Sequence, residues 1–111
     1  MTNASPSRPL EGLRVLDCSR VLSGPIAGRM LHDLGAEVIK VEPPEGDPAR
    51  ALSPLYTALN AGKATRTTDF RDAAQLAALR DLLATADVVI DSFRPGVLAG
   101  MGLDAASLHA R

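Results

Sequence analysis

Apolar and polar residues follow one another along the chain with changing periods, and these changes predict strands alternating with helices. Residues 13–18 form a short, mostly apolar run before a polar turn, which is typical of a buried strand. Apolar residues then recur at helical spacing over 26–34, which predicts a helix with one apolar face. Pro25 suits the first helical position, and Gly35 suits a left-handed cap after the last turn.

The same order of elements returns further along the chain. Residues 37–42 show no clean alternation, as expected of a strand buried on both faces in a parallel sheet. Four more elements are predicted: a helical turn at 55–59, a weak strand at 65–70, a leucine-faced helix at 76–83 and a strand at 87–91. A short helix should end at Gly102, and Asp104 should cap a last one.

Strands that alternate with helices predict the α/β class, a parallel sheet with helices on its faces. Ligands of such sheets bind beyond the carboxyl ends of the strands. Here those ends lead into loops at 18–24, 42–50 and 91–96, all rich in Gly, Pro and polar residues. The segment 43–54 is long for a loop inside a compact domain, and such loops are usually functional or disordered. The pattern therefore predicts a binding site at this edge.

Composition narrows the class of protein. A chain of 111 residues with 46% apolar and 23% charged residues fits one soluble domain. A net charge of -1 argues against a nucleic-acid partner. Cys18 is the single cysteine, so no internal disulfide can form, which suits a reducing cytoplasm, and we expect it to be a small core residue. No apolar run reaches the roughly 20 residues of a membrane span. The polar residues 1–8 are expected to be a disordered lead-in to one module, 9–111.

Local chemistry leaves the ligand open. The turn at 19–25 ends at a helix start, whose free N–H groups suit a phosphate, although an ordinary strand-to-helix turn looks the same. Glu42 closes the second strand about twenty residues later, where dinucleotide-binding domains keep a ribose-binding carboxylate. This spacing is compatible with an NAD- or FAD-binding half-domain. The glycine-rich fingerprint is missing, however, so a solvated carboxylate is the plainer interpretation of Glu42.

The remaining polar residues point to no particular reaction. Four basic residues can each neutralise a phosphate or simply be solvated: Lys63, Arg66, Arg71 and Arg94. His32 and His109 have no second ligand at metal spacing, so we expect surface residues and no metal. No nucleophile and base stand at a recognisable spacing, so no catalytic residue is assigned within this chain.

The order of short motifs is more specific than any one of them. They are, in sequence, residues 9–17, 21–25, 33–42, 46–50, 60–63, 86–96 and 101–103. This ordered set closely resembles the opening of family III CoA-transferases, the CaiB/BaiF family. Its members include formyl-CoA transferase, carnitine CoA-transferase and α-methylacyl-CoA racemase. The resemblance covers nearly the whole chain, from about residue 9 to residue 111.

The resemblance implies a Rossmann-like, CoA-binding N-terminal half, incomplete relative to the full family fold. It implies transfer of CoA between carboxylic acids, or, in the racemase branch, inversion beside the thioester. In the transferase branch an Asp carboxylate attacks acyl-CoA, forms a mixed anhydride and releases CoA for the next step. By resemblance that Asp lies beyond Arg111, so this chain alone is expected to be inactive. The family also implies an interlocked homodimer and, because further strands would complete the sheet, an exposed apolar edge here.

Carried over position by position, the resemblance implies these CoA contacts: Val21, Leu22, Ser23, Thr68, Arg71, Ser92, Phe93, Arg94 and Met101. The first three would lie beside the pantetheine, and the others at the adenine and phosphate end. Three positions depart from relatives, because Pro43 and Gly100 stand where Arg occurs and Ser92 where Asn is common. The alternatives are the dinucleotide-binding half-domain and a non-catalytic interaction module that keeps the scaffold.

Overall fold

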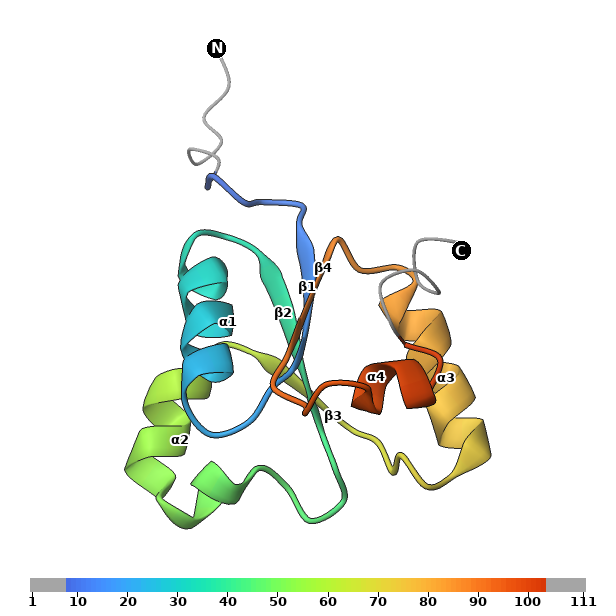
Figure 1. Ribbon diagram of the computed structural model, residues 1–111. Coiled ribbons are helices and arrows are strands. Elements are labelled where there is room, and N and C mark those ends of the chain that lie inside the picture. Colours follow the sequence, from blue (N-terminus) through green and yellow to red (C-terminus); the bar gives the residue numbers. More distant parts are fainter. Residues whose placement is uncertain (1–7, 104–111) are drawn as a thin grey trace.

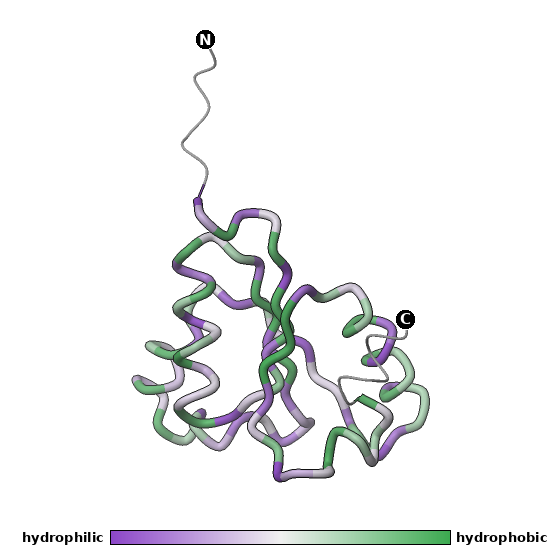
Figure 2. The backbone as a smooth tube through the Cα atoms, turned by 45° about the horizontal axis from the view of Figure 1, so that its top comes forward, coloured by the Kyte–Doolittle hydropathy of each residue, from purple (hydrophilic) through white to green (hydrophobic). Residues whose placement is uncertain are grey.

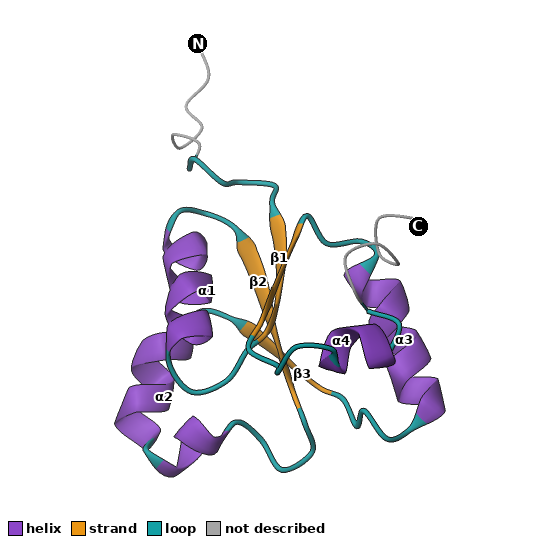
Figure 3. Cartoon of the chain, viewed as in Figure 1, coloured by secondary structure: helices purple, strands orange, loops and turns teal. Residues whose placement is uncertain are grey.

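A computed structural model describes residues 8–103 and contains one parallel sheet flanked by helices (Figures 1 and 3). The α/β prediction is therefore confirmed. The strands are β1 (Arg14–Cys18), β2 (Glu37–Glu42), β3 (Ala64–Thr67) and β4 (Val88–Asp91). The helices are α1 (Ser23–Asp33), the 3-10 turn η1 (Pro48–Ala51), α2 (Ser53–Asn60), α3 (Ala73–Leu83) and α4 (Val97–Gly100).

The strand order is β3-β2-β1-β4, so the direction in which successive strands are added reverses after β3, and the point of reversal lies between β1 and β4. In register, Leu16 of β1 lies between Ile39 of β2 and Val89 of β4. Strands β2 and β3 are added in turn on one side of β1, and β4 is then added on its other side. The carboxyl ends of β1 and β4 therefore form the crevice at which such sheets bind ligands.

Helices α1 and α2 cover one face of the sheet, and α3 and α4 cover the other (Figure 1). Because side chains alternate along a strand, β1 sends Leu16 to the α3 side and Val15 to the α1 side. The main apolar core lies on the α3 side and consists of Leu16, Cys18, Val41, Leu79, Leu83 and Leu103. A smaller cluster of Val15, Ala36 and Val38 lies on the α1 side. The apolar strands run through the middle of the fold (Figure 2).

Several element boundaries differ from the sequence-based expectations. Helix α1 begins at Ser23, so Pro25 is in its first turn rather than at its first position. Helix α2 is longer than the predicted turn, η1 lies inside the predicted loop 43–54, and β3 is shorter than predicted. The expected lead-in, apart from residue 8, and the expected helix from Asp104 lie outside the described residues.

The apolar stripe of α1 is real, but much of it faces solvent. Ile26 is 39% exposed, Met30 62% and Leu34 46%. The residues that α1 buries are Pro25 and Gly28. A side chain at Gly28 would meet the carboxylate of the buried Asp17 at 2.7 Å, so only glycine lets the helix approach this closely. Exposed apolar surface therefore lies on this helix.

Candidate functional site

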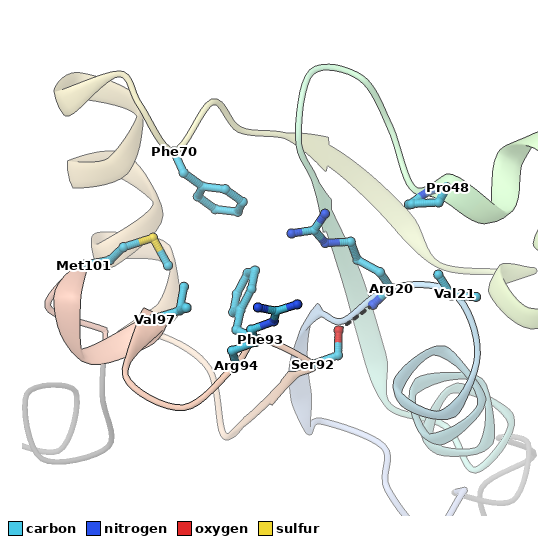
Figure 4. Close-up of a pocket in the computed structure, with 9 residues that line it drawn as sticks. All are labelled: Arg20, Val21, Pro48, Phe70, Ser92, Phe93, Arg94, Val97 and Met101. Atoms are coloured by element: carbon cyan, nitrogen blue, oxygen red, sulfur yellow. Dashed lines mark hydrogen bonds between the residues drawn. The ribbon is translucent and has the colours of Figure 1, made fainter.

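A cavity of about 690 Å³ opens at the carboxyl ends of β1 and β4 (Figure 4). Its walls come from the loops after both strands, the start of η1, the segment before α3, and α4. The lining residues are Arg20, Val21, Pro48, Phe70, Ser92, Phe93, Arg94, Val97 and Met101. The cavity thus occupies the edge where the sequence predicts a binding site, and it combines apolar walls with two arginines.

Two phenylalanines form the apolar wall of this cavity. The rings of Phe70 and Phe93 pack edge to face, with centroids 5.9 Å apart. Both also pack against the core beneath α3, which fixes their position. Such an aromatic wall offers a flat ring both area and a favourable stacking geometry.

Arg20 connects the cavity to a smaller neighbour. Its guanidinium lies 5.7 Å from the centroid of Phe93, within cation–π range. The smaller cavity, of about 220 Å³, shares Arg20 and Phe70 with the larger one and also contains Arg71. Three arginines therefore surround two adjoining hollows: Arg20, Arg71 and Arg94. Arg20 is not among the contact residues predicted from the sequence, although its place in the loop after β1 was a usable signal.

The loop from residue 19 to 22, which we call the β1–α1 loop, is held from several sides. The N–H of Arg20 donates to Ser92 Oγ at 3.0 Å, which ties the loop after β1 to the loop after β4 (Figure 4). The N–H of Val21 donates to Asp47 Oδ1 at 3.2 Å. Val21 has a φ of 67°, and among the described residues no other non-glycine residue has a positive φ. A β-branched residue adopts this conformation only under constraint.

The first constraint on the loop is a buried ion pair. Lys40 Nζ lies 2.8 Å from Asp47 Oδ2, and their side chains are 0% and 1% exposed. Lys40 also donates to the carbonyl oxygen of Ser19 at 3.0 Å. Burial opposes ionisation of Asp47, but hydrogen bonds from Lys40, Ala49 and Val21 outweigh it and hold the pKa of this carboxyl below its usual range. The sequence pattern predicted that β2 is buried on both faces, but it did not predict that this strand buries a charge.

A second buried pair lies beneath the first turn of α1. Lys63 Nζ is 2.7 Å from Asp17 Oδ2, and it also donates to the oxygens of Pro25 and Asn60. Burial lowers the pKa of Lys63, while Asp17 opposes this shift. Lys63 is thus neither a solvated charge nor free to bind phosphate, and the expectation that it could neutralise one is wrong. Asp17 in turn accepts from the N–H and the hydroxyl of Ser19.

Glu42 is the centre of a third buried ionic group, and the expectation of a solvated carboxylate is wrong. The residue is 2% exposed and accepts from Arg50, from Tyr56 and from the N–H of Asp47. The hydrogen bond from Arg50, supported by Asp47 and Tyr56 against burial, lowers the pKa of Glu42 to about 2. Each of the two carboxylate oxygens of Glu42 already accepts two hydrogen bonds, so neither is free to accept one from a ribose hydroxyl.

The structure gathers most of the predicted contact residues. Val21, Ser92, Phe93, Arg94 and Met101 line the larger cavity, and Arg71 lines the smaller one. Thr68 is 2% exposed, and its N–H donates to the carbonyl of Glu42 at 2.8 Å. Thr68, Leu22 and Ser23 line neither cavity.

Other predicted features have plain structural accounts. Arg66 is exposed on β3 and lines neither of the two cavities. Cys18 is buried, and burial first, then the charges of Asp17 and Asp91, raise the pKa of its thiol to about 12. The prediction of a core cysteine is confirmed. His32 is half-buried against Gly62 rather than free on the surface, and His109 lies outside the described residues.

Two features are absent from residues 8–103. No group of three or more His, Cys, Asp or Glu residues there is placed to hold a metal ion. No helix within the described part of the chain is long and apolar enough to cross a membrane.

Comparisons with known proteins identify the class to which this fold and cavity belong. Residues 10–111 match CoA-transferase family III, and the chain belongs to this family. It is 45% identical to the succinate–glutarate CoA-transferase of Agrobacterium fabrum over 98% of its length, and 41% identical to Rv3272 of Mycobacterium tuberculosis over 100%. The chain spans 30% and 31% of these two relatives.

Solved structures agree with this assignment. A crystal structure of Rv3272 superposes on 96% of the chain with a TM-score of 0.91 at 43% identity, and the chain covers 30% of it. A CaiB/BaiF family protein from Brucella suis superposes on 95% with a TM-score of 0.89 at 44% identity, with 31% of that protein covered. The resemblance inferred from the ordered motifs is thereby confirmed, and the sheet described here is one part of a larger family fold.

Proposed function

We propose that this chain is the N-terminal CoA-binding portion of an acyl-CoA:carboxylate CoA-transferase, with residues 9–111 as the binding module. The observation that carries the proposal is the cavity between the carboxyl ends of β1 and β4. It contains five of the nine contact residues that the family resemblance implies, together with Arg20. Its position at the turning point of the strand order is where open parallel sheets take their ligands.

The chemistry of the walls suits the nucleotide end of CoA. Phe70 and Phe93 offer an aromatic surface for the adenine ring. Arg94 and Arg20 border the same cavity, and Arg71 borders the adjoining one. A guanidinium group can donate two parallel hydrogen bonds to the oxygens of one phosphate, and it remains charged at every physiological pH. Pro43 and Gly100 stand at positions where Arg occurs in relatives, and Arg20 supplies positive charge that these two positions lack.

For the whole protein we propose that an Asp outside this chain performs the covalent step. The carboxylate would attack the acyl carbon of acyl-CoA, forming a mixed anhydride and releasing the CoA thiolate. The thiolate would then attack the Asp carbonyl of the anhydride, which releases the donor acid and leaves an Asp–CoA thioester, and CoA would pass from this thioester to the acceptor acid by the same steps in reverse. The chain alone would then bind without catalysing. We also propose a cytoplasmic homodimer with CoA and acyl-CoA as ligands, no metal, and no nucleic-acid or membrane partner. The membership of the chain in CoA-transferase family III supports this set of proposals.

A titration with CoA, dephospho-CoA and NAD tests the proposal, after circular dichroism has shown that the chain is folded. We expect CoA to bind more tightly than dephospho-CoA. Arg94→Gln or Arg71→Gln should each lower the affinity for CoA by about tenfold, because each removes one charge-assisted hydrogen bond. Arg29→Gln is the matched control, because Arg29 lies on α1 and pairs with Asp33. Equal binding of CoA and dephospho-CoA would refute the phosphate assignment, and a preference for NAD would favour a dinucleotide-binding domain.

A further inference from the structure

The β1–α1 loop and the loop before η1 meet through groups that solvent does not reach. Lys40 and Asp47 are both fully buried, and each forms a hydrogen bond with the backbone of the β1–α1 loop. Lys40 bonds the carbonyl of Ser19, and Asp47 accepts from the N–H of Val21. The pair therefore holds two backbone groups of one short loop that borders the cavity.

Stability alone gives little reason to bury such a pair. Removing two charges from water is costly, and apolar side chains of similar volume often serve the core as well or better. Val38, two residues before Lys40 on the same face of β2, shows that this face accepts an apolar residue. The burial of this ion pair is therefore better explained by a role in fixing the geometry of the loop than by a role in stabilising the fold.

The loop needs such a restraint because Val21 is held in the left-handed region. Its φ of 67° is unfavourable for a β-branched residue, so an unrestrained loop would move Val21 to ordinary backbone angles. That change would turn the peptide between Arg20 and Val21, and both of these residues line the cavity. The conformation that the ion pair holds is thus the one that shapes the cavity wall.

Asp47 is itself fixed from below. Its N–H donates to Glu42 Oε1 at 2.7 Å, and Oδ1 accepts from the N–H of Ala49 at 2.9 Å. Glu42 is the last residue of β2 and is buried. A continuous series of buried contacts therefore leads from the sheet through Asp47 to Val21.

From this geometry we infer that the Lys40–Asp47 ion pair is a positioning device, which holds Arg20 and Val21 in the conformation that binds the ligand. The inference rests on the proposed binding of CoA in this cavity. Neither Lys40 nor Asp47 lines the cavity, so both act through the loop and not by touching the ligand.

The test combines CoA affinity with amide hydrogen exchange at Val21 in the folded chain. We expect Asp47→Asn to lower the affinity for CoA about tenfold and to raise the exchange rate of the Val21 amide about tenfold, because the variant loses a charged hydrogen bond. Glycine adopts a positive φ without strain. In a Val21→Gly background Asp47→Asn should therefore weaken CoA by less than about threefold, because a shared role makes the two changes non-additive.

Val15→Ala is the control for general destabilisation, because Val15 is fully buried in the smaller apolar cluster on the α1 side, and that cluster and the apolar residues packed against it include no residue of the loop or of the cavity wall. It should lower stability and leave CoA affinity within about twofold of wild type, as for distant sites. An Asp47→Asn variant with unchanged affinity and unchanged Val21 exchange would overturn the inference. So would an equal loss of affinity with and without Val21→Gly.

The same experiment separates the two proposals. Wild-type protein that is folded but does not bind CoA would refute the proposed function. Val21 exchange would then decide the positioning role alone: acceleration confined to the loop in Asp47→Asn would support it, and unchanged exchange would refute it.

Discussion

The two faces of the sheet differ in the interactions that they bury: apolar contacts on one face, and both apolar contacts and charged groups on the other. On the α3 side the strands present Leu16, Val41 and their neighbours to Leu79 and Leu83, and this core is apolar throughout. On the α1 side an apolar cluster lies near the start of the strands. Toward the carboxyl ends the same face buries Asp17, Lys40 and Glu42 instead.

This difference separates stabilisation from positioning. Apolar burial stabilises the fold without favouring one loop conformation, because the hydrophobic effect has no direction. Buried ions must be paired and hydrogen-bonded, so each of them fixes its partners in place. In a parallel sheet the carboxyl ends lie at one edge, and charges buried there lie directly under the candidate site.

The largest effect should come from Lys63→Met, which leaves Asp17 buried without its cation. Breaking a buried pair on one side typically lowers the free energy of unfolding by about 3–5 kcal/mol. Urea denaturation followed by circular dichroism measures the change. Adding Asp17→Leu should restore part of the loss, because it removes the unpaired charge. A loss below about 1 kcal/mol for Lys63→Met alone would mean that water reaches Asp17.

Leu79→Ala probes the apolar face and should rank second. Leu79 is 0% exposed, so the truncation leaves a cavity in the main core and should lower the free energy of unfolding by about 2–4 kcal/mol. No titrating group is involved, so we expect the same loss in urea denaturation at pH 5 and at pH 8. A loss that changes with pH across this range would show that the two faces are energetically coupled.

Glu42→Gln should have a smaller effect that depends on pH. The folded pKa of Glu42 is about 2, below the ordinary 4.5, so its ionic contribution is present above pH 4.5 and is lost as the pH falls toward 2. Because Arg50 is half exposed, we expect a loss of roughly 2 kcal/mol at pH 7. Denaturation curves of wild type and variant should converge toward pH 2, and a constant difference would contradict this account.

The smallest effect should come from Glu37→Gln at the opposite end of the sheet. Glu37 pairs with Arg14 at 3.1 Å, and both side chains are well exposed, at 56% and 36%. Solvent screens such pairs, so we expect a change below about 1 kcal/mol that disappears in high salt. A larger change in urea denaturation would mean that exposure does not separate the two kinds of ion pair in this protein.

Sequence patterns predicted a large part of this molecule. The apolar runs around Leu16 and Val89 and the helical spacing of Leu76, Leu79 and Leu83 are local signals, so the order of elements followed from them. The edge at which the cavity lies followed too, because parallel strands all point their carboxyl ends the same way. Family motifs then located five of the residues that line the larger cavity.

Burial of charge was not predictable in this way. Lys40, Glu42 and Lys63 look like solvated residues in sequence, since local patterns predict burial from apolar character alone. Likewise the apolar stripe of α1 predicts a buried face, yet Met30 is 62% exposed. Arg20 was missed because its role depends on Phe93 and Ser92, which lie more than 70 residues away along the chain.

By itself the sequence determined the class of fold, the edge of the sheet that carries the cavity and the family to which the chain belongs, since each of these follows from short-range patterns and their order. Tertiary structure alone decided which charges are buried and which conformation the β1–α1 loop takes. The physical reason is that an ion pair such as Lys40 with Asp47 exists only when separate segments meet away from water. The angle at Val21 likewise depends on a carboxylate from another loop.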